Sequence, residues 1–104
     1  MIGIYPVTGY NFSFGSKSSA KQLEKLINAK NIKNVHLSFQ DGVGIYNHLG
    51  YEVTVPQRGS HAIAHVGEYE FPLVIPHKGK DISPFDLKRL KYIALGDIER
   101  AKRI

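Results

Sequence analysis

Two short segments of the chain combine histidine with cationic side chains. The first reads Arg58-Gly59-Ser60-His61 and the second reads His77-Lys78-Gly79-Lys80. Histidine is the side chain whose ordinary pKa lets it give or take a proton near neutral pH, and lysine and arginine bind phosphates. The combination suggests cleavage of RNA without a metal ion.

RNA carries its own nucleophile, the 2′-hydroxyl group. A protein that cleaves it must remove the 2′ proton, offset charge on the phosphoryl oxygens and protonate the leaving 5′-oxygen. His61 is the candidate catalytic residue, as general base or acid, and His77 is a possible supporting residue. The candidate RNA-binding residues are Arg58, Gly59, Ser60, Lys78 and Lys80.

Composition limits the classes of protein that fit. A chain of 104 residues, 42% of them hydrophobic, is expected to form one domain with a modest core. The 14 Lys and Arg residues against 9 Asp and Glu give a net charge of +5, which favours nucleic acid or an acidic protein as partner. The absence of cysteine excludes a disulfide scaffold and a thiolate zinc site.

We expect no cofactor and no metal site, because no His, Asp and Glu residues have the spacing of metal ligands. No apolar run approaches the ~18 residues of a membrane span, and the N-terminus lacks the pattern of a signal peptide. We therefore expect a soluble, cytoplasmic protein with no membrane partner.

The elements that must position these residues follow from local patterns. Residues 1–18 are expected to be an N-terminal arm or a short hairpin, because Tyr10, Phe12 and Phe14 alternate with polar residues, as in a half-buried strand. Residues 19–104 are expected to be the domain. Its first helix is predicted to begin at Ser19 and to end near Lys30.

The remaining elements are a second helix, three strands and a third helix. The second helix is predicted from a capping box at Ser38 to a stop at Gly50. Strands are predicted over 51–55, 60–66 and 71–75, with a hairpin loop over 67–70 and the last strand at the sheet edge because of its prolines. The third helix is predicted from an N-cap at Ser83 to a stop at Gly96, with a tail helix after Asp97.

This order predicts an α+β fold, a three-stranded antiparallel sheet with helices on one face. That is the geometry of a double-stranded-RNA-binding domain with an additional N-terminal helix. Strand alternation places His61 and His65 on the open face, with the small residues Ala62 and Ala64 toward the helices. If the loop is 67–70, His61 lies opposite Pro76, and a His61–His77 pair is possible but not supported by strand parity.

The same residues resemble the HicA toxin family of mRNA interferases. The resemblance rests on Gly59-Ser60-His61, on Leu73-Val74-Ile75-Pro76-His77 and on Lys80-Asp81-Ile82 before a helix, and it covers about residues 19–95. It implies a fold like a double-stranded-RNA-binding domain, mRNA cleavage that requires His61, and neutralisation by a HicB-type antitoxin. The chain departs from the family at Ala62 and Ala64, where larger residues are common.

Two functions without chemistry compete with this interpretation. One is an RNA-binding module of the double-stranded-RNA-binding type, in which Lys78 and Lys80 hold phosphates. The other is a protein-interaction domain whose basic surface binds an acidic partner. A requirement for His61 distinguishes the enzyme from both alternatives.

Overall fold

The sheet has four antiparallel strands in the order β1-β2-β3-β4. The structure is a computed structural model that describes residues 2–5 and 12–104. The expected three-stranded sheet is present as β2, β3 and β4, and β1 adds a fourth strand beside β2. The strands are β1 (Ile2–Tyr5), β2 (Glu52–Pro56), β3 (His61–Val66) and β4 (Tyr69–Val74).

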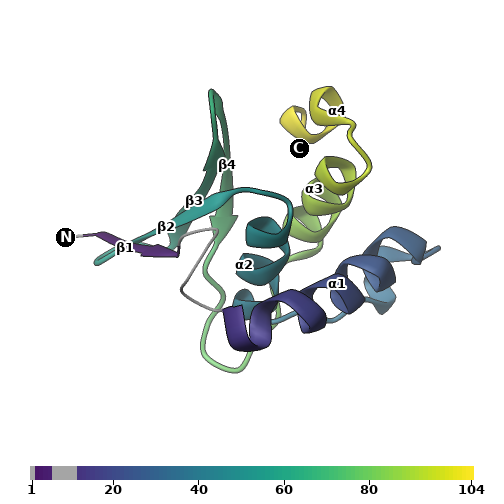
Figure 1. The fold of residues 1–104 in the computed structure, drawn as a ribbon, viewed down its shortest axis with the longest axis horizontal. Coiled ribbons are helices and arrows are strands. Elements are labelled where there is room, and N and C mark those ends of the chain that lie inside the picture. The colour runs from purple at the N-terminus through teal and green to yellow at the C-terminus, as the bar shows by residue number, and fades with distance from the viewer. Residues whose placement is uncertain (1, 6–11) are drawn as a thin grey trace.

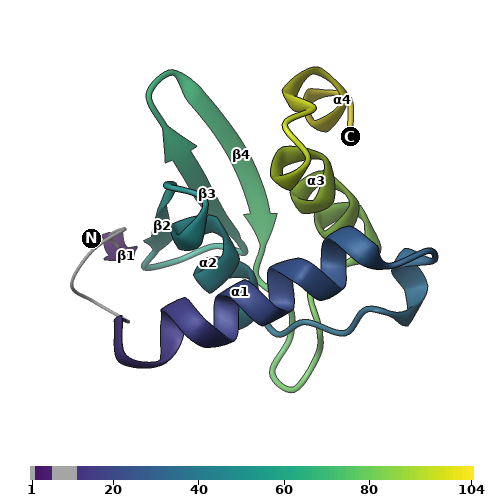
Figure 2. The ribbon, with the colours of Figure 1, turned by 45° about the vertical axis from the view of Figure 1, so that its right-hand side comes forward.

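The helices lie on one side of the sheet, as predicted (Figure 1). Helix α2 contacts strand β2 and helix α3 contacts strand β4, and α1 packs against both α2 and α3 (Figure 2). None of the described helices is long and apolar enough to cross a membrane. The helices are α1 (Phe12–Asn28), η1 (Ile32–Asn34, a 3-10 turn), α2 (Phe39–His48), α3 (Pro84–Ala94) and α4 (Ile98–Lys102).

Three helix starts confirm the predictions made from capping residues. Ser38 accepts a hydrogen bond from the Asp41 amide, and the Asp41 carboxylate accepts one from the Ser38 amide, which completes the capping box of α2. Ser83 caps α3 with Pro84 in its first turn, and Asp97 caps α4. These boundaries follow from side chains that bond to backbone amides nearby in sequence.

The predicted start of the first helix was wrong. Helix α1 begins at Phe12, so the segment from Phe12 to Ser18 is helical rather than part of an arm or hairpin, and the helix crosses the expected boundary at residue 18. Tyr10 lies outside the described residues. Ser19 is not a cap but a buried residue inside the helix, packed against Gly44 of α2.

The register of the β3–β4 hairpin also differs from the prediction. The turn is the two residues Gly67 and Glu68, so Val66 pairs with Tyr69 and His61 pairs with Val74. The predicted loop of four residues was too long by two. A shift of two residues preserves the alternation of faces, so the predicted faces of β3 are confirmed.

The core lies between the sheet and α2 and α3. Ala62 and Ala64 are completely buried there, and Ala64 pairs with Val53 on one side and Phe71 on the other. Larger aromatic side chains belong to the same core, including Tyr46 and Tyr51 with ring centroids 5.4 Å apart. The largest completely buried side chains are Tyr46, Leu26, Leu37, Ile45, Leu73, Leu90, Val43 and Val53.

Candidate active site

His61 is the first residue of β3 and is exposed on the sheet face that the helices leave open. Burial along the strand alternates from exposed His61 to buried Ala62 and again to buried Ala64. The two alanines face the helices because a strand directs successive side chains to opposite sides. The sequence-based placement of His61 is therefore confirmed.

Ser60 holds one nitrogen of the His61 ring. The hydroxyl oxygen Oγ of Ser60 lies 3.2 Å from Nδ1 of His61. The other ring nitrogen, Nε2, has no hydrogen-bond partner among the described residues. A histidine held at Nδ1 and open at Nε2 is oriented for proton transfer through Nε2. The sequence singled out Ser60 as a neighbour of the histidine, but it gave no sign of this contact.

The loop between β2 and β3 carries Arg58 and Gly59. All four loop residues, 57–60, are exposed. Arg58 forms no ion pair with any of the described acidic residues, so its guanidinium group is available to an anion. The loop enters β3 directly, which places Arg58 three residues before His61.

The loop between β4 and α3 carries His77, Lys78 and Lys80, all of them exposed. The amide of Lys80 donates to the carbonyl of His77 at 2.9 Å. Gly79 has a φ of +81° in this turn, a conformation that glycine adopts without steric cost. The turn therefore presents two lysines next to each other on the surface.

The two loops leave the same end of the sheet. The amide of Ile75 donates to the carbonyl of Ser60 at 2.7 Å, one residue beyond the pairing of His61 with Val74. The structure thus joins the residue that contacts His61 to the start of the lysine-bearing loop. No hydrogen bond or ion pair among the described residues joins His61 to Arg58, Lys78 or Lys80.

Strand pairing does not place His77 opposite His61. The observed register moves the partner of His61 from Pro76 to Val74, and strand β4 ends there. His77 follows three residues later in the loop. No hydrogen bond among the described residues joins the two rings, and a supporting role for His77 stays a prediction.

His65 lies on the same face as His61 but is engaged elsewhere. Its Nε2 lies 3.0 Å from Oγ1 of Thr54 on β2, and the ring is half-buried. Among residues 2–5 and 12–104, no group of three or more His, Asp and Glu side chains is placed to hold a metal ion.

A buried ion pair on α3 supports the strand that pairs with His61. Asp86 accepts hydrogen bonds from the Val74 amide and from the Ser83 hydroxyl. Arg89 donates to Asp86 and to the carbonyl of Pro72. Arg89 is only 8% exposed, so this cation lies inside the protein and not on a solvated helix face.

Comparison with known proteins does not add a name to this site. No protein-family model, no curated protein and no solved structure matches the chain.

Proposed function

We propose that the protein is a HicA-like toxin, an mRNA interferase that cleaves RNA without a metal ion through His61. The observation that carries the proposal is the state of His61, which is exposed on the open sheet face, held at Nδ1 by Ser60 and open at Nε2. The order α2, β2, β3, β4, α3 is also that of a double-stranded-RNA-binding domain, and this supports the family resemblance of residues 19–95.

The proposed reaction uses the 2′-hydroxyl of RNA as nucleophile. The 2′-oxygen forms a bond to phosphorus, the bond from phosphorus to the 5′-oxygen breaks, and the products are a 2′,3′-cyclic phosphate and a 5′-hydroxyl. His61 accepts the 2′ proton or delivers the proton to the 5′-oxygen through Nε2, and water completes the other transfer. Arg58, Lys78 and Lys80 offset the charge on the phosphoryl oxygens.

One histidine is expected to give a slow enzyme. A single positioned acid or base contributes about 10²- to 10⁴-fold to a reaction rate, and no hydrogen bond among the described residues joins His77 to His61. A modest rate is compatible with a toxin that acts on many transcripts. Because such activity harms its host, the proposal includes a HicB-type antitoxin as partner.

The test compares variants of histidines on the same strand. His61→Ala is expected to lower cleavage of a labelled RNA in EDTA by at least about 100-fold, while thermal unfolding and RNA binding stay unchanged. His65→Ala, on the same face, is the matched control and should retain cleavage. If His61→Ala fails to fold, His61→Gln replaces it, since glutamine keeps a polar side chain but cannot exchange a proton.

The outcome separates the enzyme from a binding module. Retained cleavage by a folded His61 variant would overturn the proposal, as would RNA binding by the wild type with no cleavage at all. In the second case the exposed lysines favour the alternative function, an RNA-binding module without chemistry. Growth arrest on expression of wild type, and its absence with His61→Ala, would show the toxin activity in cells.

A further inference from the structure

Phe85 is the most exposed large hydrophobic side chain among the described residues. It lies in the first turn of α3 and is 72% exposed. Lys88 follows three residues later, so both side chains leave the same face of the helix. An exposed aromatic ring beside a lysine can stack on a base while the lysine binds a neighbouring phosphate.

A second segment of the chain is fixed alongside this helix. Nζ of Lys91 donates to the carbonyl of Ala29 at 2.7 Å. Nδ1 of His36 lies 3.1 Å from the Asp81 carboxylate. The amide of Ile82 donates to the carbonyl of Leu37 at 2.9 Å. These three contacts hold residues 29–37, which include η1, against residues 81–91.

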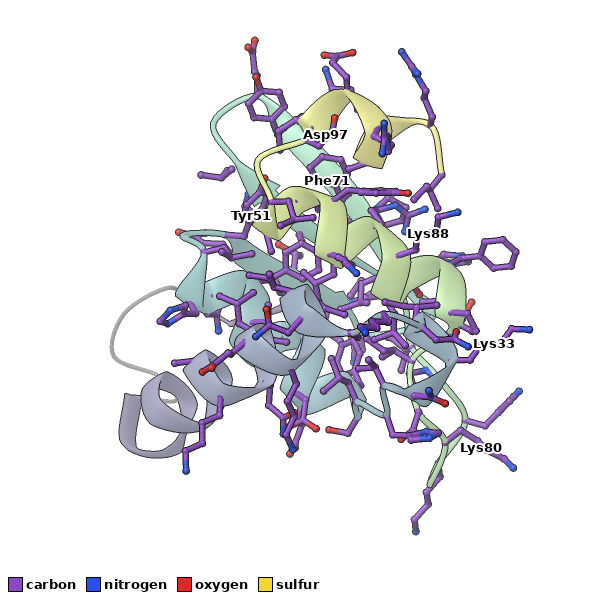
Figure 3. The ribbon with its side chains drawn as sticks, turned by 90° about the vertical axis from the view of Figure 1, so that its right-hand side faces the viewer. Lys33, Tyr51, Phe71, Lys80, Lys88 and Asp97 are labelled. Carbon is purple, nitrogen blue, oxygen red and sulfur yellow. The ribbon has the colours of Figure 1, made fainter. Side chains whose placement is uncertain are left out.

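Lysines from both segments therefore gather on one side of the molecule. Lys33 of η1, Lys88 of α3 and Lys80 of the β4–α3 loop project from the same side in Figure 3. We call Lys33, Lys80, Phe85 and Lys88 the α3–η1 surface. All three lysines are exposed.

The positive charge of the α3–η1 surface is not compensated within the described residues. None of the three lysines forms an ion pair there. Asp86 is buried against Arg89, and the carboxylate of Asp81, next to Lys80 in sequence, lies 3.1 Å from Nδ1 of His36. The surface therefore favours an anionic partner.

A hollow of about 620 Å³, lined by both polar and apolar side chains, lies where α1 ends and η1 begins. No carboxylate lines it. Side-chain amides offer paired donors and acceptors of the kind that hydrogen-bond the edges of unpaired bases. Its amide-bearing residues are Gln22, Asn28, Asn34 and Asn31, the last of which already accepts a hydrogen bond from the Lys33 amide.

We infer that the α3–η1 surface binds single-stranded RNA. The ring of Phe85 stacks on one base, Lys33, Lys80 and Lys88 bind phosphates on either side, and the hollow accepts a further base. RNA fits better than an acidic polypeptide because an exposed aromatic ring on the same helix face as Lys88 can stack on an unpaired base. A duplex keeps its bases stacked away from such a ring. The inference deepens the proposed function, on which it rests for the choice of RNA as ligand.

The test measures binding of a labelled oligouridylate to full-length protein carrying His61→Ala, so that the RNA stays intact. Phe85→Ala is expected to weaken binding about tenfold, the usual effect of losing one stacked base. Leu95→Ala is the matched control, because Leu95 is another exposed apolar residue after α3, and it should bind normally. With an oligomer of the same length that lacks bases, Phe85→Ala and its parent should bind equally.

Lysine variants test the phosphate contacts. Lys33→Ala and Lys88→Ala should each reduce the slope of log K against log salt concentration by about 0.7. Lys102→Ala, which removes a lysine paired with Glu99, should leave the slope unchanged. Binding that is insensitive to Phe85, or that depends on Phe85 only for polyglutamate or for an RNA duplex, overturns the inference.

The inference and the proposed function fail in different ways. If the wild type cleaves RNA but Phe85→Ala binds as its parent does, the inference is wrong and the enzyme proposal stands. If oligouridylate binding depends on Phe85 but the wild type does not cleave, the inference stands and the enzyme proposal is wrong.

Discussion

Arg89 and Asp86 form a buried ion pair one turn apart on α3, with 2.7 Å between Nη1 of the arginine and Oδ1 of the aspartate. The pair also bonds to the backbone of β4 at Pro72 and Val74. Since Val74 pairs with His61 across the sheet, this ion pair fixes the strand on which the candidate catalytic histidine depends.

Replacing Arg89 with methionine is expected to destabilise the protein by about 3–5 kcal/mol, because the Asp86 carboxylate would stay buried without its cation. Urea unfolding measures the change. Arg100→Met is the matched control, since Arg100 pairs with Asp97 at the same spacing but on the exposed surface, where such pairs contribute about 1 kcal/mol or less. Similar losses in the two variants would contradict a structural role for the buried pair.

Ser60 is predicted to orient the His61 ring. If its oxygen accepts the Nδ1 proton, it keeps the lone pair on Nε2, where proton transfer is proposed. Ser60→Ala removes this hydrogen bond, and we expect cleavage to fall about fivefold, in line with about 1 kcal/mol for one neutral hydrogen bond. RNA binding should stay unchanged, because the lost contact is to the histidine ring.

Ser60→Thr keeps a hydroxyl group and should restore the rate. A Ser60→Ala enzyme whose rate falls only because its RNA binding falls would mean that Ser60 acts on RNA binding and not on the histidine.

Gly44 lets α1 and α2 approach closely. A β-carbon at this position would lie 2.5 Å from Oγ of Ser19. Gly44→Ala is therefore expected to destabilise the protein, since overpacking costs about 1–3 kcal/mol and outweighs the gain of up to about 1 kcal/mol in helix propensity.

Gly44→Ala should stabilise the protein, rather than destabilise it, when residue 19 is alanine. Without Oγ the nearest atom is the β-carbon of residue 19, at 3.7 Å, which is an ordinary contact. Ser19→Ala with Gly44→Ala should then unfold at higher urea concentration than Ser19→Ala alone. Additive losses in the double variant would show that the contact of Ser19 with Gly44 is not the cause.

Burial of Tyr46 is expected to make the stability of the folded protein fall with rising pH in the alkaline range. Burial raises the pKa of its phenol well above the ordinary value, because the charged form is poorly solvated in the core. The unfolded chain releases the phenol proton above about pH 10, whereas the folded protein retains it. The free energy of unfolding is therefore unaffected by the Tyr46 phenol below pH 10. It decreases as pH rises above 10, by at most about 1.4 kcal/mol per pH unit.

Tyr46→Phe removes this proton and should reduce the loss of stability between pH 9 and pH 11, measured by urea unfolding. Tyr51, whose pKa burial also raises, remains in both proteins and contributes equally. Parallel curves for wild type and Tyr46→Phe would rule out the buried phenol as the source.

Local chemistry predicted much of this fold because several helix boundaries depend on neighbours in sequence. The capping residues Ser38 and Ser83 bond to amides three residues away, so their patterns are visible in the chain. Ser19 has the same local pattern as a cap, but its burial against Gly44 depends on the packing of two helices. No local pattern reports that contact.

The site was predicted in part for a related reason. Strand alternation placed His61 on the correct face, since a shift of two residues leaves each side chain on the same side of the sheet. The turn at Gly67 and Glu68 nevertheless changed the partner of His61 from Pro76 to Val74. The role of Arg89 could not be predicted, because opposite charges at this spacing are common on exposed helices. Only the position of β4 shows that this pair is buried.

The bonds from α3 to the backbone of β4 also protect the sheet from other chains. Because the Ile75 amide points toward Ser60, the Val74 amide and the Pro72 carbonyl point outward from the sheet edge, and side chains of α3 occupy both. Proline at 72 removes a further donor from that edge. A strand from a second molecule therefore finds few free bonding groups near His61, and this half of the edge resists the strand addition that leads to aggregation.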